Sequence, residues 1–371
     1  MRRYYLDNIR WFTIVLVMIF HVFFYFNNIG TTAVFPGLAE YQRSKGMTLA
    51  GIYQYAVYPW FMTLLFVVAG MSAYYALQKK SVKEFIRGRR DKLLVPSTLG
   101  VLCFGFISGM MLVPASAKET MEAVPGFVKY MIYTASGIGA LWFCQVLFID
   151  SLVLLAVRKI VTKLCRKERI LISSEGAACL ILIVVYFLFW GSGKLLNTPF
   201  IESYRFGIYT MAFLLGYYIF SQDKMMEIIE KRRFVSLAAA VGTGAFFVIN
   251  AYGTFYAKSV LLSSWYASLF AYFSILAVLG MSRAYADRQT KVTGFLSRVS
   301  FPVYIVHIPI MLIVLTGMSH FAISLTAKYI ILAISTFLLA PIVGLAVEKV
   351  PVIRYIVLGI RKKEEQSHEE K

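Results

Sequence analysis

The 371-residue sequence has few charged residues and no long polar stretch. Charged side chains make up 15% of the residues, whereas hydrophobic side chains make up 59%. A soluble protein has about 25% charged residues, so this composition excludes an ordinary soluble enzyme. The charges also collect in short patches between apolar runs of about 17–25 residues, the length that spans a bilayer. The sequence therefore predicts an all-α, polytopic protein embedded in a lipid bilayer.

Cysteine is scarce as well, and its positions point to no site. Cys103, Cys144 and Cys179 lie inside apolar runs, and Cys165 lies in a basic loop. Their spacing matches neither a disulfide framework nor a set of metal ligands, so we interpret them as small buried apolar residues. The sequence also lacks a glycine-rich phosphate loop. We expect no metal and no permanently bound cofactor.

Ten apolar segments are long enough to cross the membrane. With their connecting loops they form one transmembrane domain over residues 1–358, and a charged tail follows at 359–371. The predicted spans are residues 9–29, 52–78, 94–113, 139–157, 175–192, 200–220, 234–251, 259–281, 299–318 and 323–347.

The net charge of +19 is distributed unevenly between the loops. Most of the 38 Lys and Arg residues fall in segments that the ten spans place on the same side as the N-terminus. Such a bias marks the cytoplasmic side. We therefore predict that both termini are cytoplasmic and that the basic charge orients the protein rather than binding nucleic acid. A signal peptide is disfavoured, because the first apolar run is interrupted by polar residues and lacks a small-residue cleavage site.

The first span contains three residues that a membrane helix normally avoids, Asp7, Arg10 and His21. A charged side chain there costs about 2.5–3.5 kcal/mol on insertion scales. Arg10 and His21 are eleven positions apart, so they share one helix face at a separation of about 16 Å along the axis. Asp7 lies one turn before Arg10 and can pair with it. His21 is either a structural imidazole or a group that takes a proton from a substrate hydroxyl.

Polar residues in two other spans also have alternative interpretations. Ser300, Tyr304 and His307 lie at i, i+4 and i+7 of the ninth span and share a face. They form either a hydrogen-bonded seam or one wall of a cavity opposite His21. Asp150, in the fourth span, is expected to make a hydrogen bond to a neighbouring helix, because an unpartnered carboxyl group in the membrane is costly.

The outer side of the protein carries a further group of candidates. Glu202 and Arg205 lie one turn apart at the outer end of the sixth span. They either pair with each other and cap the span, or contact a sugar. Trp142 belongs to an interfacial aromatic belt or stacks on a sugar ring.

Several segments resemble acyltransferase family 3, a family of membrane proteins. "YLDNIR", followed by the His of "MIFH", is similar to the Arg-x10-His signature of the family's first span. Ala69 stands where many members have Ser, and Lys92 stands where a second Arg is usual. Further segments resemble the family in the same order: "LLFVVAGMSAYYAL" (64–77), "FIRGRRDKLLVP" (85–96), "GALWFCQVLF" (139–148), "AFLLGYYIF" (212–220) and "SRVSFPVYIVHIPI" (297–310).

The resemblance implies an O-acyltransferase of the bacterial inner membrane. Such an enzyme moves an acetyl or succinyl group from cytosolic acyl-CoA, its donor substrate, to a hydroxyl of a cell-surface or extracytoplasmic glycan. By position, His21 would be the catalytic histidine and Arg10 its partner. No appended soluble domain is expected, so the protein either completes the transfer itself or uses a separate extracytoplasmic partner.

The basic inner loop suits the phosphate groups of the donor, although loops on this side are basic for topological reasons too. Lys92, which stands where the family usually has an arginine, keeps the positive charge but lacks the bidentate fork of arginine. The candidates for donor binding are Arg87, Arg89, Arg90 and Lys92. The alternative function is a transporter or flippase for a polysaccharide or lipid-linked sugar, and a third is a sensor or scaffold that has lost activity. A transporter needs a polar path but has no particular need for a histidine aligned with an arginine.

Overall fold

Long helices packed side by side make up almost the whole of the protein. In the computed structural model, the described residues are 2–26, 47–112, 118–165, 172, 174–198 and 204–361. Every regular element among them is a helix, apart from one isolated β-bridge between Asn197 and Arg205. The predicted all-α fold class is confirmed.

The helices follow one another in a simple chain order. Three segments, η2, η3 and η6, have the wider π-helical turn, and η5 is a short 3-10 turn. The elements are α1 (Tyr4–Phe24), α2 (Leu49–Val57), α3 (Phe61–Leu77), α4 (Val82–Arg89), η2 (Arg90–Leu94), η3 (Pro96–Gly105), α5 (Phe106–Leu112), α6 (Lys118–Glu122), α7 (Gly126–Ser136), η5 (Gly139–Leu141), α8 (Trp142–Cys165), α9 (Glu175–Ser192), α10 (Phe206–Leu215), η6 (Gly216–Phe220), α11 (Asp223–Lys231), α12 (Arg233–Ala251), α13 (Ser259–Leu262), α14 (Trp265–Tyr285), α15 (Lys291–Met318), α16 (Leu325–Lys349) and α17 (Pro351–Leu358).

Nine helices in the described part of the chain are long and apolar enough to cross a membrane. They correspond to nine of the ten predicted spans. The remaining span, predicted at 200–220, contains a shorter apolar helix, Phe206–Phe220. The nine are Tyr4–Phe24, Leu49–Leu77, Val82–Leu112, Gly139–Leu164, Glu175–Ser192, Arg233–Ala251, Trp265–Tyr285, Lys291–Met318 and Leu325–Lys349.

Some helix boundaries differ from the predicted ones for local reasons. The first helix starts at Tyr4 rather than at residue 9, because its early polar side chains have partners and do not end the helix. The ninth span starts at Lys291 rather than at residue 299. There, Thr290 caps the helix by accepting a hydrogen bond from the backbone N–H of Thr293, which satisfies one of the free donors of the first turn.

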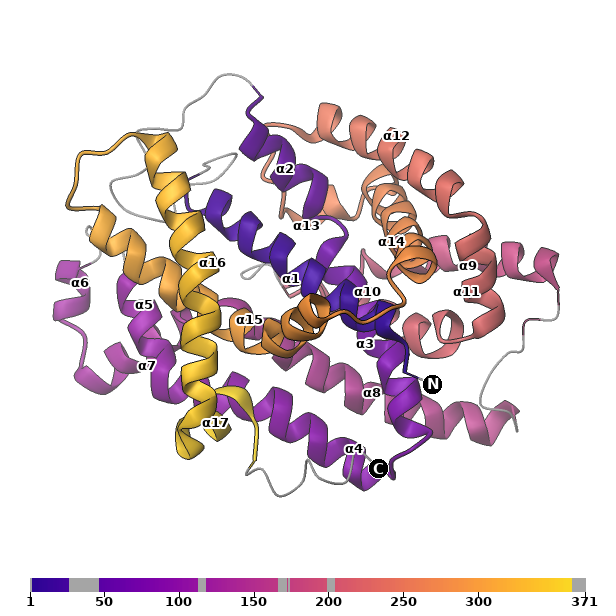
Figure 1. Cartoon of the computed structure of the whole chain (residues 1–371), viewed down its shortest axis with the longest axis horizontal. Helices are drawn as coiled ribbons and strands as arrows, with labels where there is room; N and C mark the ends of the chain where they lie inside the picture. The colour runs from indigo at the N-terminus through magenta and orange to yellow at the C-terminus, as the bar shows by residue number, and fades with distance from the viewer. Residues whose placement is uncertain are drawn as a thin grey trace.

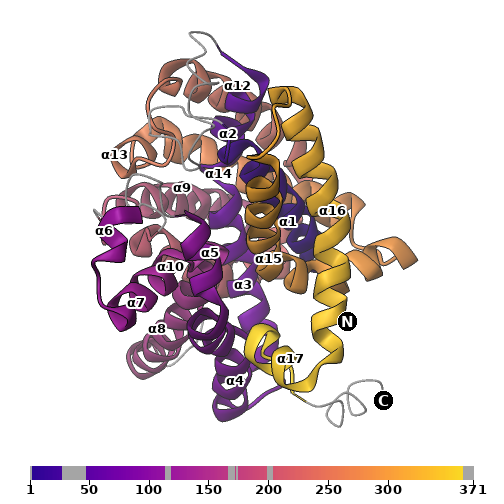
Figure 2. The same cartoon turned by 90° about the vertical axis from the view of Figure 1, so that its left-hand side faces the viewer.

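Helix α1 occupies the centre of the bundle and contacts α2, α3, α14, α15 and α16 (Figure 1). The α2–α3 pair is largely buried, whereas α9 and α16 leave most of their apolar surface exposed, as lipid-facing helices do. Helices α4 and α17 lie at one end of the bundle, and α2 and α13 lie at the other (Figures 1 and 2). Helix α1 runs from the first end to the second, so Arg10 and His21 lie toward opposite ends.

Two glycines allow α3 to approach α10 and η6 at backbone distance. A Cβ atom on Gly70 would lie 2.0 Å from the carbonyl oxygen of Phe213, and one on Gly216 would lie 2.2 Å from that of Val67. Any larger residue would therefore force the helices apart. Small residues at a membrane helix interface permit such close packing, and here they fix α3 against the helix that carries Tyr209.

Candidate active site

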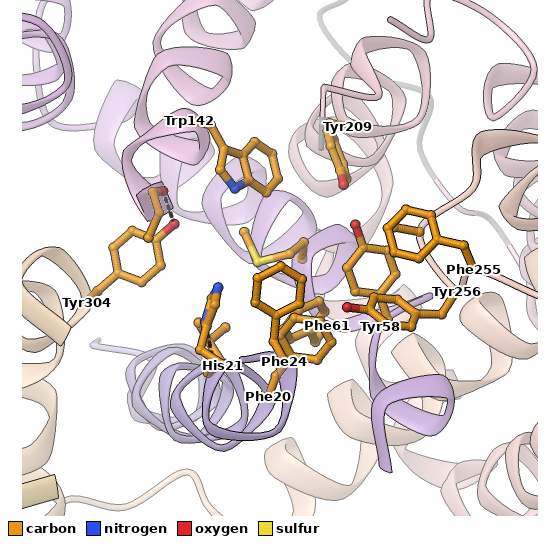
Figure 3. Close-up of a pocket in the computed structure, with 14 residues that line it drawn as sticks. Phe20, His21, Phe24, Tyr58, Phe61, Trp142, Tyr209, Phe255, Tyr256 and Tyr304 are labelled. Atoms are coloured by element: carbon orange, nitrogen blue, oxygen red, sulfur yellow. Dashed lines mark hydrogen bonds between the residues drawn. The ribbon is translucent and has the colours of Figure 1, made fainter. Parts of the chain in front are cut away.

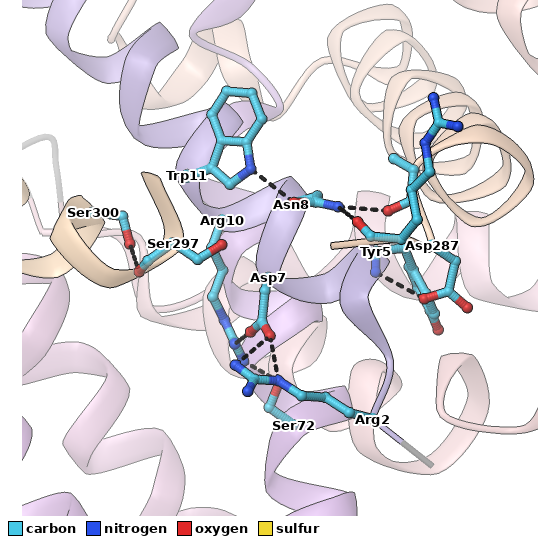
Figure 4. A network of polar contacts seen from close by, with 12 residues as sticks. Arg2, Tyr5, Asp7, Asn8, Arg10, Trp11, Ser72, Asp287, Ser297 and Ser300 are labelled. Atoms are coloured by element: carbon cyan, nitrogen blue, oxygen red, sulfur yellow. Dashed lines mark hydrogen bonds and ion pairs between the residues drawn. The ribbon is translucent and has the colours of Figure 1, made fainter. Parts of the chain in front are cut away.

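The N-terminal end of α1 is fixed by hydrogen bonds to the segment that follows α14. The side-chain amide of Asn8 donates to the carbonyl oxygens of Ala286, at 2.6 Å, and Arg288, at 3.0 Å. The backbone N–H of Tyr5 donates to Oδ1 of Asp287 at 3.1 Å. Figure 4 shows this network beside the side chains of Asp7 and Arg10. These bonds set the depth and rotation of the helix that carries the candidate residues.

Arg10 is held in one orientation by two polar side chains. Its NH1 group lies 2.6 Å from Oδ1 of Asp7, on the same helix face, and its NH2 group donates to the hydroxyl of Ser72 on α3 (Figure 4). Ser72 in turn donates to the carbonyl oxygen of Val68 at 2.7 Å. The sequence indicated Asp7 as a partner but gave no signal for Ser72, because that contact joins two helices.

Of the four candidate residues in the basic inner loop, Arg89 interacts with Arg10. Arg89 interacts electrostatically with Arg10, and its guanidinium stacks over the ring of Phe85 at 5.1 Å. The two like charges repel each other, and the carboxylate of Asp7, 2.6 Å from Arg10, offsets part of this repulsion.

The other basic residues of this loop are placed differently. Arg90 pairs with the buried carboxylate of Asp91 at 2.8 Å, and Arg361, after α17, pairs with the same carboxylate at 3.0 Å. Arg87 and Lys92 are exposed. Asp91 therefore joins the C-terminal segment to η2 through Arg361, whereas Arg87 and Lys92 remain at the surface.

His21 faces His307, which lies 286 positions away in the sequence, across the interface of α1 and α15. Nδ1 of His21 lies 2.9 Å from the carbonyl oxygen of Val17 and 3.4 Å from Nε2 of His307. Nδ1 of His307 lies 2.7 Å from the carbonyl oxygen of Tyr304. His307 is fully buried.

The carbonyl partners determine which ring nitrogens carry hydrogen. A carbonyl oxygen can only accept, so the Nδ1 atoms facing Val17 and Tyr304 must be donors. In the neutral rings, each Nε2 is then an acceptor. The Nδ1–H of His21 is shared between the oxygen of Val17 and Nε2 of His307. The lone pair on Nε2 of His21 is left for another group.

A cavity of about 360 Å³ opens beside His21. Figure 3 shows the imidazole of His21 pointing into it, with Trp142 and Tyr304 nearby and a group of aromatic side chains across it. Its walls come from α1, α3, α8, α10, α15 and neighbouring segments. They are formed by Val17, Phe20, His21, Phe24, Tyr58, Phe61, Met62, Ala140, Trp142, Tyr209, Phe255, Tyr256, Ala257 and Tyr304.

The ninth-span residues divide between this cavity and their own helix. Tyr304 lines the cavity and donates from its hydroxyl to the carbonyl oxygen of Ala140 at 2.5 Å. His307 lies behind His21. Ser300 instead donates to the carbonyl oxygen of Ser297 at 2.9 Å. Of the three residues predicted to share a helix face, only Tyr304 and His307 lie beside His21: Tyr304 lines the same cavity, and His307 contacts the His21 ring.

Among the other candidates, Trp142 is at the cavity wall, where its indole packs against the ring of Tyr209 at 5.5 Å. Asp150 is fully buried, and its Oδ1 accepts a hydrogen bond of 2.5 Å from Thr210. Arg205 is buried beside the start of α10. Glu202 lies outside the described residues. No cluster of three or more metal-binding side chains occurs in the described part of the chain.

Comparison with protein families decides what kind of protein carries this site. The model described as an acyltransferase domain, that of acyltransferase family 3, matches residues 3–345. The chain belongs to acyltransferase family 3. It is therefore a membrane acyltransferase. Comparisons with curated proteins and with solved structures gave no match. The family 3 domain contains α1 and α15, and hence Arg10, His21 and His307.

Proposed function

We propose that this family 3 protein is an O-acyltransferase that moves an acetyl or succinyl group from acyl-CoA to a hydroxyl of a glycan. The observation that carries the proposal is the placement of His21. Its Nδ1–H is bound to the carbonyl oxygen of Val17 and to His307, and its Nε2 faces an aromatic cavity. A neutral imidazole with a fixed donor side and a free lone pair is suited to act as a general base.

The proposed reaction is a direct transfer in which His21 handles one proton. The hydroxyl oxygen of the glycan attacks the thioester carbonyl carbon, and the C–O bond forms while the C–S bond breaks. Nε2 of His21 takes the proton from the hydroxyl and then gives it to the departing sulfur of coenzyme A. His307 stabilises the imidazolium by accepting from Nδ1–H, as an orienting group does for other catalytic histidines.

The donor would approach from the N-terminal end of α1. Coenzyme A carries phosphate groups far from its thioester, and Arg10 lies about 16 Å along α1 from His21. Arg89 of α4 adds a second positive charge that interacts electrostatically with Arg10. Guanidinium groups bind phosphate bidentately. The positive-inside bias favours a cytoplasmic location for this end. In that orientation acyl-CoA would enter from the cytosol, and the cavity would open toward the outer side of a bacterial inner membrane.

The acceptor side is supported by the composition of the cavity wall. Trp142, Tyr209 and Tyr58 present aromatic surface together with polar edges, and such side chains pack against an apolar face while hydrogen bonding at the edge. Sugar rings have the same combination of apolar faces and hydroxyl groups. A glycan bound there would hold a hydroxyl beside His21.

Acyl transfer by purified protein in liposomes tests the proposal. Labelled acetyl-CoA or succinyl-CoA is enclosed, and neutral and uronate-containing oligosaccharides are added outside. We expect labelled esters from the wild type and a loss of about 10²–10⁴-fold in His21→Ala, the usual contribution of a general base. His320→Ala is the matched control, because His320 is exposed and lies outside the cavity. Oligosaccharide entry without ester formation, unchanged in His21→Ala, would indicate a transporter instead.

A further inference from the structure

Arg205 is a buried cation whose charge is not balanced by the described part of the protein. Its exposed fraction is 3%. Neither Nε nor NH2 of its guanidinium has a hydrogen-bond partner within the described residues. The nearby amide of Asn197 donates to the carbonyl oxygen of Gly193 instead, at 2.8 Å, and its Oδ1 atom does not accept from Arg205. A buried guanidinium with two unpaired N–H groups is costly unless a further acceptor reaches it.

The position of Arg205 connects it to the cavity. It directly precedes α10, and the backbone N–H of Tyr209, one turn later, donates to the carbonyl oxygen of Arg205 at 3.2 Å. The guanidinium also lies near enough to Tyr209 and Tyr58 to interact with them electrostatically. Both tyrosines line the cavity. In Figure 3, Tyr58 and Tyr209 lie across the cavity from Tyr304. Arg205 does not itself line the cavity, but it lies next to the two tyrosines that form the wall across from Tyr304.

We propose that Arg205, with the hydroxyls of Tyr58 and Tyr209, forms a subsite for a carboxylate on the substrate. The subsite rests on the proposed function, because it shares the acyl-transfer cavity. One guanidinium balances one negative charge and fits a planar carboxylate through two parallel hydrogen bonds. A phosphate monoester carries about −1.5 to −2 charges, more than this single cation neutralises. The carboxylate is either the far end of a dicarboxylic acyl group or part of an acidic sugar acceptor.

A comparison of charged and neutral substrates separates these two sources. Donor preference is measured with succinyl-CoA against acetyl-CoA, and acceptor preference with a glucuronate-containing against a glucose-containing oligosaccharide. We expect Arg205→Gln to reduce kcat/KM about 10- to 100-fold for the anionic member of one pair, the usual range for a lost charge-assisted hydrogen bond, and to leave the neutral member unchanged. Arg205→Lys should recover part of the preference.

Lys194→Gln is the matched control for this comparison. Lys194 is an exposed cation in the segment between α9 and α10, and it does not line the cavity. Its ammonium group lies over the ring of Trp190, 3.9 Å from the ring centre. Its substitution should leave both preferences intact. Equal losses for charged and neutral substrates in Arg205→Gln would overturn the subsite while the acyltransferase function stands.

Binding and stability measurements test the subsite without relying on transfer. Affinities for the same four probes are measured by calorimetry. The proposal requires that one anionic probe binds more tightly than its neutral counterpart and that Arg205→Gln removes the difference. Removing an unbalanced buried charge should also leave Tm unchanged or raise it. A similar fall in Tm for Arg205→Gln and Glu202→Gln, with unchanged probe preference, would show that Arg205 has a structural pairing role and would refute the subsite.

Discussion

Replacing His307 with alanine should reduce kcat for acyl transfer modestly and leave KM for acyl-CoA unchanged. His307 touches His21 from behind, through the 3.4 Å contact between Nε2 and Nδ1, and it does not line the cavity. It therefore acts on the reaction only through the orientation and charge of His21. We regard it as a positioning residue.

The expected size of the effect follows from the hydrogen bonds of His21. A neutral hydrogen bond contributes about 0.5–1.5 kcal/mol, which corresponds to about 2- to 13-fold in rate. The 3.4 Å contact is long for such a bond, so the lower part of this range applies. The carbonyl oxygen of Val17 still accepts from Nδ1–H at 2.9 Å. His307→Ala should thus be far less damaging than His21→Ala, for which we expect about 10²–10⁴-fold.

The assay is ester formation in proteoliposomes at saturating acyl-CoA, with thermal unfolding in detergent as a check on folding. The double variant is the most informative sample. If His307 acts only through His21, His307→Ala should have no further effect in a His21→Ala background. A loss in the double variant equal to the product of the two single losses would refute this role, and so would a His307→Ala protein that unfolds normally but is as inactive as His21→Ala.

Three further predictions concern other parts of the molecule. Gly70→Ala should lower the free energy of unfolding by about 1–3 kcal/mol, because the added Cβ would lie 2.0 Å from the backbone oxygen of Phe213. Gly88→Ala is the control and should not lower Tm, because a Cβ at that position meets no atom within 4 Å. Arg10→Gln should raise KM for acyl-CoA at least tenfold in initial-rate measurements, and an unchanged KM would remove Arg10 from the donor site. Asp91→Asn should lower the free energy of unfolding by about 1–2 kcal/mol, because its two arginine partners are partly exposed, and an unchanged Tm would contradict this.

Local patterns in the sequence were sufficient to predict most of the helices. Runs of apolar residues are tied to the bilayer thickness, and nine predicted spans correspond to helices of the described chain. The sixth span is shorter than expected, because its helix begins only at Phe206 and continues through π-helical turns to Phe220. Apolar composition alone does not reveal such a start or the wider turns.

The candidate site could be predicted only in part. Helical periodicity placed Arg10 and His21 on one face, because both belong to the same helix. Contacts between helices are set by packing, so the sequence did not indicate that Ser72 would bind Arg10. It also suggested a common role for three residues of α15, yet Ser300 bonds to its own helix, whereas His307 reaches His21.

The proposed reaction depends on proton transfer by His21 in the cavity. The most direct measurement is single-turnover ester formation from labelled acyl-CoA by wild type, His21→Gln and His320→Ala in the same liposomes. We expect a rapid first turnover for wild type and His320→Ala, and a first turnover at least about 100-fold slower for His21→Gln, with bound acyl-CoA unchanged. A His21→Gln protein that forms the ester at the wild-type rate would contradict this role of His21.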